Sequence, residues 1–132
     1  MIDEIYYYDS SIIKITEAIK LNSGGYAINP IWEGDTLTVC TPFEKLKPIP
    51  LNRQVFNALG FESRGGKWTK DLDISVSCNI YEKGKGLCEI EVFFWGIQDK
   101  SFSIQLSYVH ELQRLFKGLK IDIDWDKLLT VL

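Results

Sequence analysis

The chain has 132 residues, of which 45% are hydrophobic and 13% aromatic, and its formal net charge is −3. This composition excludes a disordered chain, and the length suits one domain with a core of its own. No apolar run approaches the roughly 20 residues that a membrane helix needs. The N-terminal sequence is acidic and lacks the basic region of a signal peptide. We therefore predict a single cytoplasmic domain over residues 1–132, without a membrane partner.

The cysteine and histidine content argues against a metal centre. Cys40, Cys78 and Cys88 form no metal-binding spacing, and their odd number argues against a disulfide framework. The single histidine, His110, cannot build a zinc site by itself. We expect reduced thiols, no metal and no cofactor.

Charge is unevenly distributed along the chain. Residues 1–43 carry six acidic side chains against two lysines, a net charge of −4, whereas residues 44–70 carry six basic against two acidic side chains, a net charge of +4. The basic segment is the candidate for binding a nucleic acid or an acidic protein.

Residues 1–46 predict short strands joined by tight turns at 22–25 and 33–35, forming a small curled sheet or an SH3-like barrel. Three successive tyrosines, residues 6–8, place aromatic side chains on both sides of the first strand. Exposed tyrosine is common at protein interfaces, so Tyr7 is a candidate contact.

Pro48 and Pro50 favour an extended segment in the middle of the chain. A short helix over 51–59 follows, with Asn52 as its N-cap and Gly60 as the left-handed residue that ends it. Residues 64–67 then predict a turn between two short strands.

Three alternating apolar runs predict an antiparallel meander over residues 72–106. Their inward residues are Ile74, Val76, Cys78 and Ile80, then Cys88, Ile90, Val92 and Phe94, then Phe102, Ile104 and Leu106. We predict the register that pairs Ile80 with Cys88 and Val92 with Ile104, with a loop at 83–85.

A helical pattern over 108–119 follows, with Ser107 as the expected N-cap, and its apolar stripe suits packing on the apolar face of the meander. Residues 121–125 alternate like an edge strand. The fold class is therefore α+β, with an antiparallel sheet, a C-terminal helix on one face and a short central helix.

Phe93 and Trp95 interrupt the polar face of the predicted sheet. Two aromatic side chains there need a cover, either the N-terminal strands or a partner. They are the strongest candidates for protein contacts.

Three motifs resemble catalytic or ligand sites but lack essential parts. Asp122, Asp124 and Asp126 resemble the start of a calcium loop without its glycine and its final glutamate. The Gly-Gly-Lys sequence at 65–67 lacks the spacing of a phosphate loop. His110 and Glu111 are adjacent on a helix and point in different directions. With no nucleophile signature either, we predict that the protein is not an enzyme.

Three segments resemble a recurrent family of small proteins encoded in phages, prophages and mobile elements of gut anaerobes. They are Pro-Ile-Pro-Leu at 48–51, Leu-Gly-Phe-Glu at 59–62, and Tyr-Val-His-Glu-Leu-Gln-Arg-Leu-Phe at 108–116. Glu111 and Arg114 stand where that family usually has glutamine and asparagine. The resemblance covers about residues 45–125 and carries no established activity; it implies a small accessory protein.

These observations predict a non-enzymatic cytoplasmic accessory protein that binds another protein, with anti-defence or regulatory inhibition as one form. The expected protein contacts are Trp95, Phe93, Tyr7, His110 and Arg114. The alternative is a nucleic-acid-binding accessory protein that uses Arg53, Arg64, Lys67 and Trp68. Homodimer formation is also left open.

Overall fold

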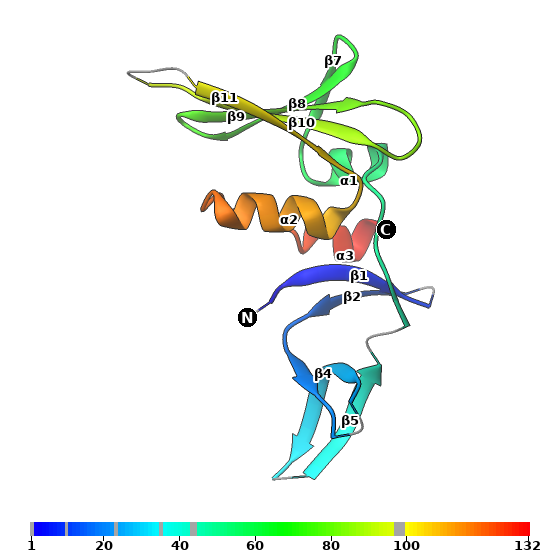
Figure 1. Ribbon diagram of the computed structural model, residues 1–132. Coiled ribbons are helices and arrows are strands. Elements are labelled where there is room, and N and C mark those ends of the chain that lie inside the picture. The colour runs from blue at the N-terminus through cyan, green and yellow to red at the C-terminus, as the bar shows by residue number, and fades with distance from the viewer. Residues whose placement is uncertain (1, 10, 23, 35, 43–44, 97–99) are drawn as a thin grey trace. The chain divides into compact units, whose positions relative to one another are not determined.

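The computed structural model describes residues 2–9, 11–22, 24–34, 36–42, 45–96 and 100–132, with the backbone alone at Trp32 and at 36–42. The chain divides into two compact units, residues 1–49 and 50–132. Both contain antiparallel sheets, and the second adds short helices, which confirms the predicted α+β class (Figure 1).

Unit 1, residues 1–49, consists of two three-stranded sheets. Its strands are β1 (Glu4–Tyr8), β2 (Ser11–Ile15), β3 (Ala18–Lys20), β4 (Tyr26–Glu33), β5 (Thr36–Pro42) and β6 (Leu46–Lys47). Their orders are β2-β1-β6 and β3-β4-β5, and no described strand closes either sheet into a barrel. Tyr6, Ile15 and Ile28 form a common buried cluster. The N-terminal strands therefore form two small sheets rather than one curled sheet.

Asn29 connects β4 to the chain between β2 and β3. Its side-chain oxygen accepts hydrogen bonds from the backbone N–H of Thr16 at 2.8 Å and from the Thr16 hydroxyl at 3.1 Å. Its amide donates to the Lys14 carbonyl at 2.9 Å. The residue has a φ of 48° and lies at an irregularity in the ladder between β4 and β5. Asparagine tolerates this left-handed conformation better than most residues.

Unit 2, residues 50–132, contains a five-stranded antiparallel sheet with the order β11-β10-β9-β8-β7. Its elements are α1 (Arg53–Ala58), β7 (Glu62–Arg64), β8 (Lys67–Asp73), β9 (Val76–Glu82), β10 (Cys88–Phe94), β11 (Lys100–Leu106), α2 (Val109–Gly118) and α3 (Lys127–Val131). The predicted meander corresponds to β9, β10 and β11, and the β7–β8 hairpin extends it. Figure 1 shows α1 and α2 on the same side of this sheet.

Helix α1 has the predicted caps. The Asn52 side chain accepts a hydrogen bond from the Val55 N–H at 3.0 Å, and Gly60 adopts a φ of 89°. The Phe61 N–H donates to the Phe56 carbonyl at 2.9 Å, and the two rings meet edge to face. This is a Schellman ending, in which a hydrophobic contact accompanies the left-handed residue. The predicted turn at 64–67 is also confirmed, with positive φ at both central glycines.

One face of the sheet is apolar and packs toward the helices. Cys78, Ile80, Ile90 and Val92 alternate with more exposed polar residues and are fully buried. Trp68 pairs with Ile80, and its ring lies 5.6 Å from that of Phe56, which places α1 on this apolar face. We call it the inner face, and the opposite, largely polar face the outer face.

The predicted strand register is wrong by two residues at both hairpins. Ile80 pairs with Ile90 rather than Cys88, and Val92 pairs with Phe102 rather than Ile104. A two-residue slip keeps every side chain on its face, so alternation could not distinguish the two registers. At the β9–β10 hairpin, loop chemistry decides the register: the loop spans 83–87, and Gly84, Lys85 and Gly86 all have positive φ.

Helix α2 begins one residue later than predicted, and its N-cap is Tyr108 rather than Ser107. Glu111 supplies the capping, because its Oε1 accepts hydrogen bonds from the backbone N–H groups of Ser107 and Tyr108, both at 3.0 Å. A carboxylate in the first turn also interacts favourably with the helix dipole. At the other end, Lys120 has a φ of 59°, in the position that glycine usually takes.

Replacement of Lys120 by glycine is expected to stabilise unit 2 by about 0.5–1 kcal/mol, because glycine adopts positive φ without strain. The Ile121 N–H donates to the Phe116 carbonyl, a backbone bond that the substitution leaves intact. The matched control is Lys117→Gly inside α2, which should destabilise by a similar amount. Urea unfolding of both variants checks this, and a Lys120→Gly protein less stable than wild type would contradict it.

The predicted edge strand at 121–125 is wrong. These residues have no strand partner, and α3 follows directly. Phe116 contacts Trp125 with ring centroids 6.0 Å apart, so the alternating apolar side chains serve packing against α2 instead of a ladder. Among the helices described, none is long and apolar enough to cross a bilayer.

Candidate protein-binding site

Phe93 and Trp95 form a stacked aromatic pair on the outer face. Their rings stack with centroids 5.7 Å apart and planes 10° from parallel. The Trp95 indole N–H donates to the Ser77 hydroxyl at 3.2 Å, and its backbone N–H donates to the Ser75 carbonyl at 2.7 Å. The indole is therefore held over β9, yet Trp95 remains 52% exposed.

Ile74 is an exposed apolar residue that is close to this pair along the backbone. It occupies the two-residue turn between β8 and β9, beside the Ser75 carbonyl that Trp95 contacts, and it is 98% exposed. We call Ile74, Phe93 and Trp95 the aromatic patch. Large apolar side chains that stay exposed near an ordered aromatic pair are typical of an interaction surface.

Carboxylates flank the aromatic patch. Asp71 and Phe93 both pair with Ser77, so the three side chains form one row across β8, β9 and β10. Adjacent strands lie about 4.8 Å apart, which places Asp71 about 10 Å from Phe93. In the next row, the Glu91 carboxylate accepts hydrogen bonds from Asn79 and Tyr81, both at 3.3 Å. Partial burial, and then this negative charge, raise the pKa of the Tyr81 hydroxyl.

Within unit 2, the two predicted protein contacts on α2 do not join the aromatic patch. His110 is half-buried on α2, where its ring stacks on Tyr108 at 5.8 Å, and Arg114 is exposed on the same helix. Helix α2 lies on the inner side of the sheet (Figure 1). Phe93, which pairs with Ser77, and Trp95, which bonds to the Ser77 hydroxyl, are on the outer face. Tyr7 belongs to unit 1, where it is half-buried and pairs with Ile12 and Lys47.

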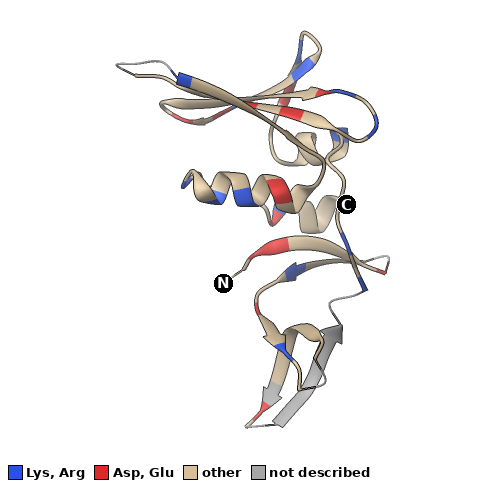
Figure 2. Cartoon of the chain, in the orientation of Figure 1, with Lys and Arg blue, Asp and Glu red and all other residues tan. Residues whose placement is uncertain are grey.

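The predicted nucleic-acid residues lie on both faces of the sheet and on α1. Trp68 points to the inner face, while Arg64 and Lys67 pair with each other and point to the outer face. Arg64 forms an ion pair with Glu62 at 2.6 Å. Figure 2 shows acidic and basic positions interspersed over unit 2. The positive charge of residues 44–70 is therefore divided among several elements and partly neutralised.

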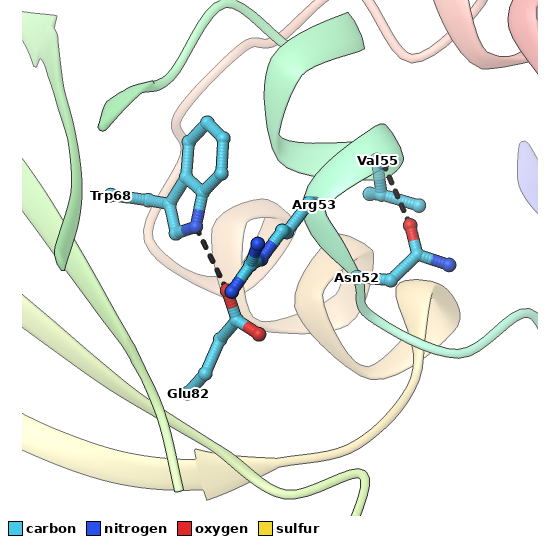
Figure 3. A network of polar contacts seen from close by, with 5 residues as sticks. All are labelled: Asn52, Arg53, Val55, Trp68 and Glu82. Carbon is cyan, nitrogen blue, oxygen red and sulfur yellow. Dashed lines mark hydrogen bonds and ion pairs between the residues drawn. The ribbon is translucent and has the colours of Figure 1, made fainter. Parts of the chain in front are cut away.

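Glu82 engages two of these residues at once (Figure 3). Its Oε1 accepts a hydrogen bond from the Trp68 indole N–H at 3.1 Å and forms an ion pair with the Arg53 Nε at 3.4 Å. The Trp68 ring is also in contact with Phe56. Trp68 is half-buried, and its contacts with Phe56 and Glu82 hold it between α1 and the sheet.

Among the residues whose side chains are described, the remaining candidates for chemistry are a pocket and the thiols of Cys78 and Cys88; Cys40 lies outside them. A polar pocket of about 250 Å³ is lined by Gly60, Glu62, Arg64, Thr69, Lys70 and Asp71. The lining includes two acidic and two basic side chains, so their formal charges cancel. Burial raises the pKa of the Cys78 thiol to about 12, and burial also raises that of Cys88, so both thiols stay protonated at neutral pH. In the part of the chain that the structure describes, no three acidic, histidine or cysteine side chains form a metal-binding group.

Ile74 is the site residue that the sequence did not reveal. Its place in the run from Ile74 to Ile80 suggested an inward strand position. The Asp73 side chain accepts a hydrogen bond from the Ile74 N–H at 2.6 Å and stabilises a turn there. Aspartate before a turn was the available signal.

Comparisons of this chain with protein-family models, with curated proteins and with solved structures returned no match.

Proposed function

We propose that this protein is a non-enzymatic accessory protein that binds another protein through the aromatic patch of Ile74, Phe93 and Trp95. The observation that carries the proposal is the ordered, half-exposed Trp95. Its stacking on Phe93 and its hydrogen bond to Ser77 fix the indole before any partner arrives. A pre-ordered aromatic anchor loses little conformational entropy on binding, and tryptophan is enriched among the residues that dominate interface energies.

The surroundings of the patch define the chemistry of the partner. The indole and Ile74 fit an apolar side chain, and Asp71 and Glu91 favour basic or polar groups beside it. The partner surface is therefore apolar at its centre with lysine or arginine nearby. Regulatory or anti-defence inhibition in the cytoplasm, in the setting of a phage or mobile element, is the form that the family resemblance suggests.

Affinity capture tests this proposal. Wild-type protein, a Phe93→Ser/Trp95→Ser variant and a Leu129→Ser control are immobilised and exposed to nuclease-treated host lysate. Leu129 is a similarly exposed apolar residue on α3, so its replacement controls for general loss of apolar surface. We expect a protein retained by the wild type and by the control but lost from the double variant, with capture largely insensitive to salt.

Gel-shift assays test the nucleic-acid alternative. That alternative predicts a shift that weakens roughly tenfold or more between low and physiological salt and disappears when Arg64 and Lys67 are reversed in charge. A shift of this kind, together with equal protein capture by all three immobilised proteins, would overturn the protein-binding proposal.

A further inference from the structure

Strand β11 is an edge of the sheet in unit 2, and its own sequence lacks the features that protect an edge. The opposite edge, β7, has only three residues and carries Glu62 and Arg64, which discourage strand addition. β11 has seven residues, Lys-Ser-Phe-Ser-Ile-Gln-Leu, with no proline and no acid, and its ladder with β10 has no bulge. Its only charge is Lys100, at its first position.

The open stretch of this edge has a defined end. No described strand pairs with β11 on the side away from β10. Immediately after β11, the Leu51 N–H donates to the Ser107 carbonyl at 2.9 Å, and Pro50 bridges to Tyr108. The chain at 50–51 therefore occupies the edge beyond residue 106, and the open stretch coincides with Lys100–Leu106.

The sequence of β11 is complementary to itself when two copies run antiparallel about Ser103. In this register Phe102 faces the partner's Ile104, Ser101 faces the partner's Gln105, and all seven residues of each copy are paired. The apolar pairs fall on the inner face, where Ile104 is 40% exposed, and the polar pairs fall on the outer face. An aromatic side chain opposite a β-branched one is a favourable cross-strand pair. Lys100 faces the partner's Leu106, so no like charges are opposed.

We propose that two copies of this chain associate through β11, with Ser103 facing the partner's Ser103 on the two-fold axis, and so join their sheets into one. Other in-phase registers leave residues of β11 unpaired at its ends. An interface made mainly by two edge strands is smaller than the roughly 1,200–2,000 Å² of stable complexes, so the dimer is expected only at higher protein concentration. The association uses a sheet edge and does not depend on partner binding by the aromatic patch.

Charge substitution at Ser103 tests this proposal. Ser103→Glu and Ser103→Lys each place like charges opposite each other at the axis, and each variant should dimerise about tenfold more weakly than wild type in sedimentation velocity. An equimolar mixture of the two variants should recover the dimer, because glutamate then faces lysine. Only a register centred on residue 103 predicts this recovery.

Thermal unfolding of each variant controls for the fold. This matters because Ser103 also faces Glu91 on β10, so the glutamate variant is expected to be slightly less stable. A wild-type chain that sediments as a monomer up to about 1 mM would overturn the proposal. Dimers that both folded variants form as readily as the wild type, with no gain on mixing, would overturn it equally.

Discussion

Replacement of Phe56 by alanine is expected to lower the free energy of unfolding of unit 2 by about 3–5 kcal/mol, the range for removing a fully buried phenylalanine. Phe56 is fully buried, and its ring contacts both Phe61 and Trp68. It therefore links the end of α1 to the inner face of the sheet. Its loss leaves a cavity where the helix and the sheet meet, and the close-packed surroundings cannot fully close it.

Urea unfolding followed by tryptophan fluorescence measures this effect, because Trp68 lies against the Phe56 ring. The matched control is Phe56→Leu, which keeps most of the apolar volume and should cost less than about 1.5 kcal/mol. An alanine variant that loses under about 1 kcal/mol would show that α1 does not pack on this face of the sheet.

Replacement of Trp95 by alanine is expected to weaken binding of the captured partner about 30-fold or more, which corresponds to about 2 kcal/mol or more. The substitution removes the exposed indole together with its hydrogen bond to Ser77. Fold stability should change little, because the indole is half-exposed and Ser77 can bond to water instead. The two effects separate a binding anchor from a structural residue.

The helices of unit 2 were largely predictable because their signals are local. Asn52 and Gly60 mark the two ends of α1 by their own hydrogen-bonding and backbone preferences. The start of α2 was harder to predict. Serine is a common N-cap residue, so Ser107 was the expected cap, whereas the observed N-cap is Tyr108. The Glu111 carboxylate accepts hydrogen bonds from two backbone N–H groups and takes the place of a serine cap.

Strand pairing was predictable in face but not in register. The period of two assigns Val92 and Ile80 to the inner face whichever neighbour they have. At the β9–β10 hairpin, the number of loop residues, with three successive positive φ values at 84–86, fixes the register. The period of the apolar residues does not distinguish registers that differ by two residues. The prediction of a strand at 121–125 was wrong because apolar and polar residues also alternate in a segment whose apolar side chains pack on a helix.

The candidate site was predictable in part. Phe93 and Trp95 could be chosen as candidates before the fold was known, because they are aromatic residues on a predicted strand face that is otherwise polar. The ring stacking and the hydrogen bond to Ser77 depend on how the strands are arranged in space. The exposure of Ile74 depends on the β8–β9 turn, at a place where the alternating apolar run predicted a strand. By residue type alone, Trp68 was an equally good candidate for a binding contact. In the structure its contacts with Phe56 and Glu82 place it on the inner face.

The most direct test of the proposed function is the dissociation constant of the captured partner, measured by titration calorimetry for wild type, Trp95→Ala and Leu129→Ala. Leu129 is 37% exposed on α3 and serves as the control for loss of exposed apolar surface. We expect about 30-fold weaker binding or more for Trp95→Ala and a change of less than about twofold for Leu129→Ala. A folded Trp95→Ala protein that binds the partner as tightly as wild type would contradict it.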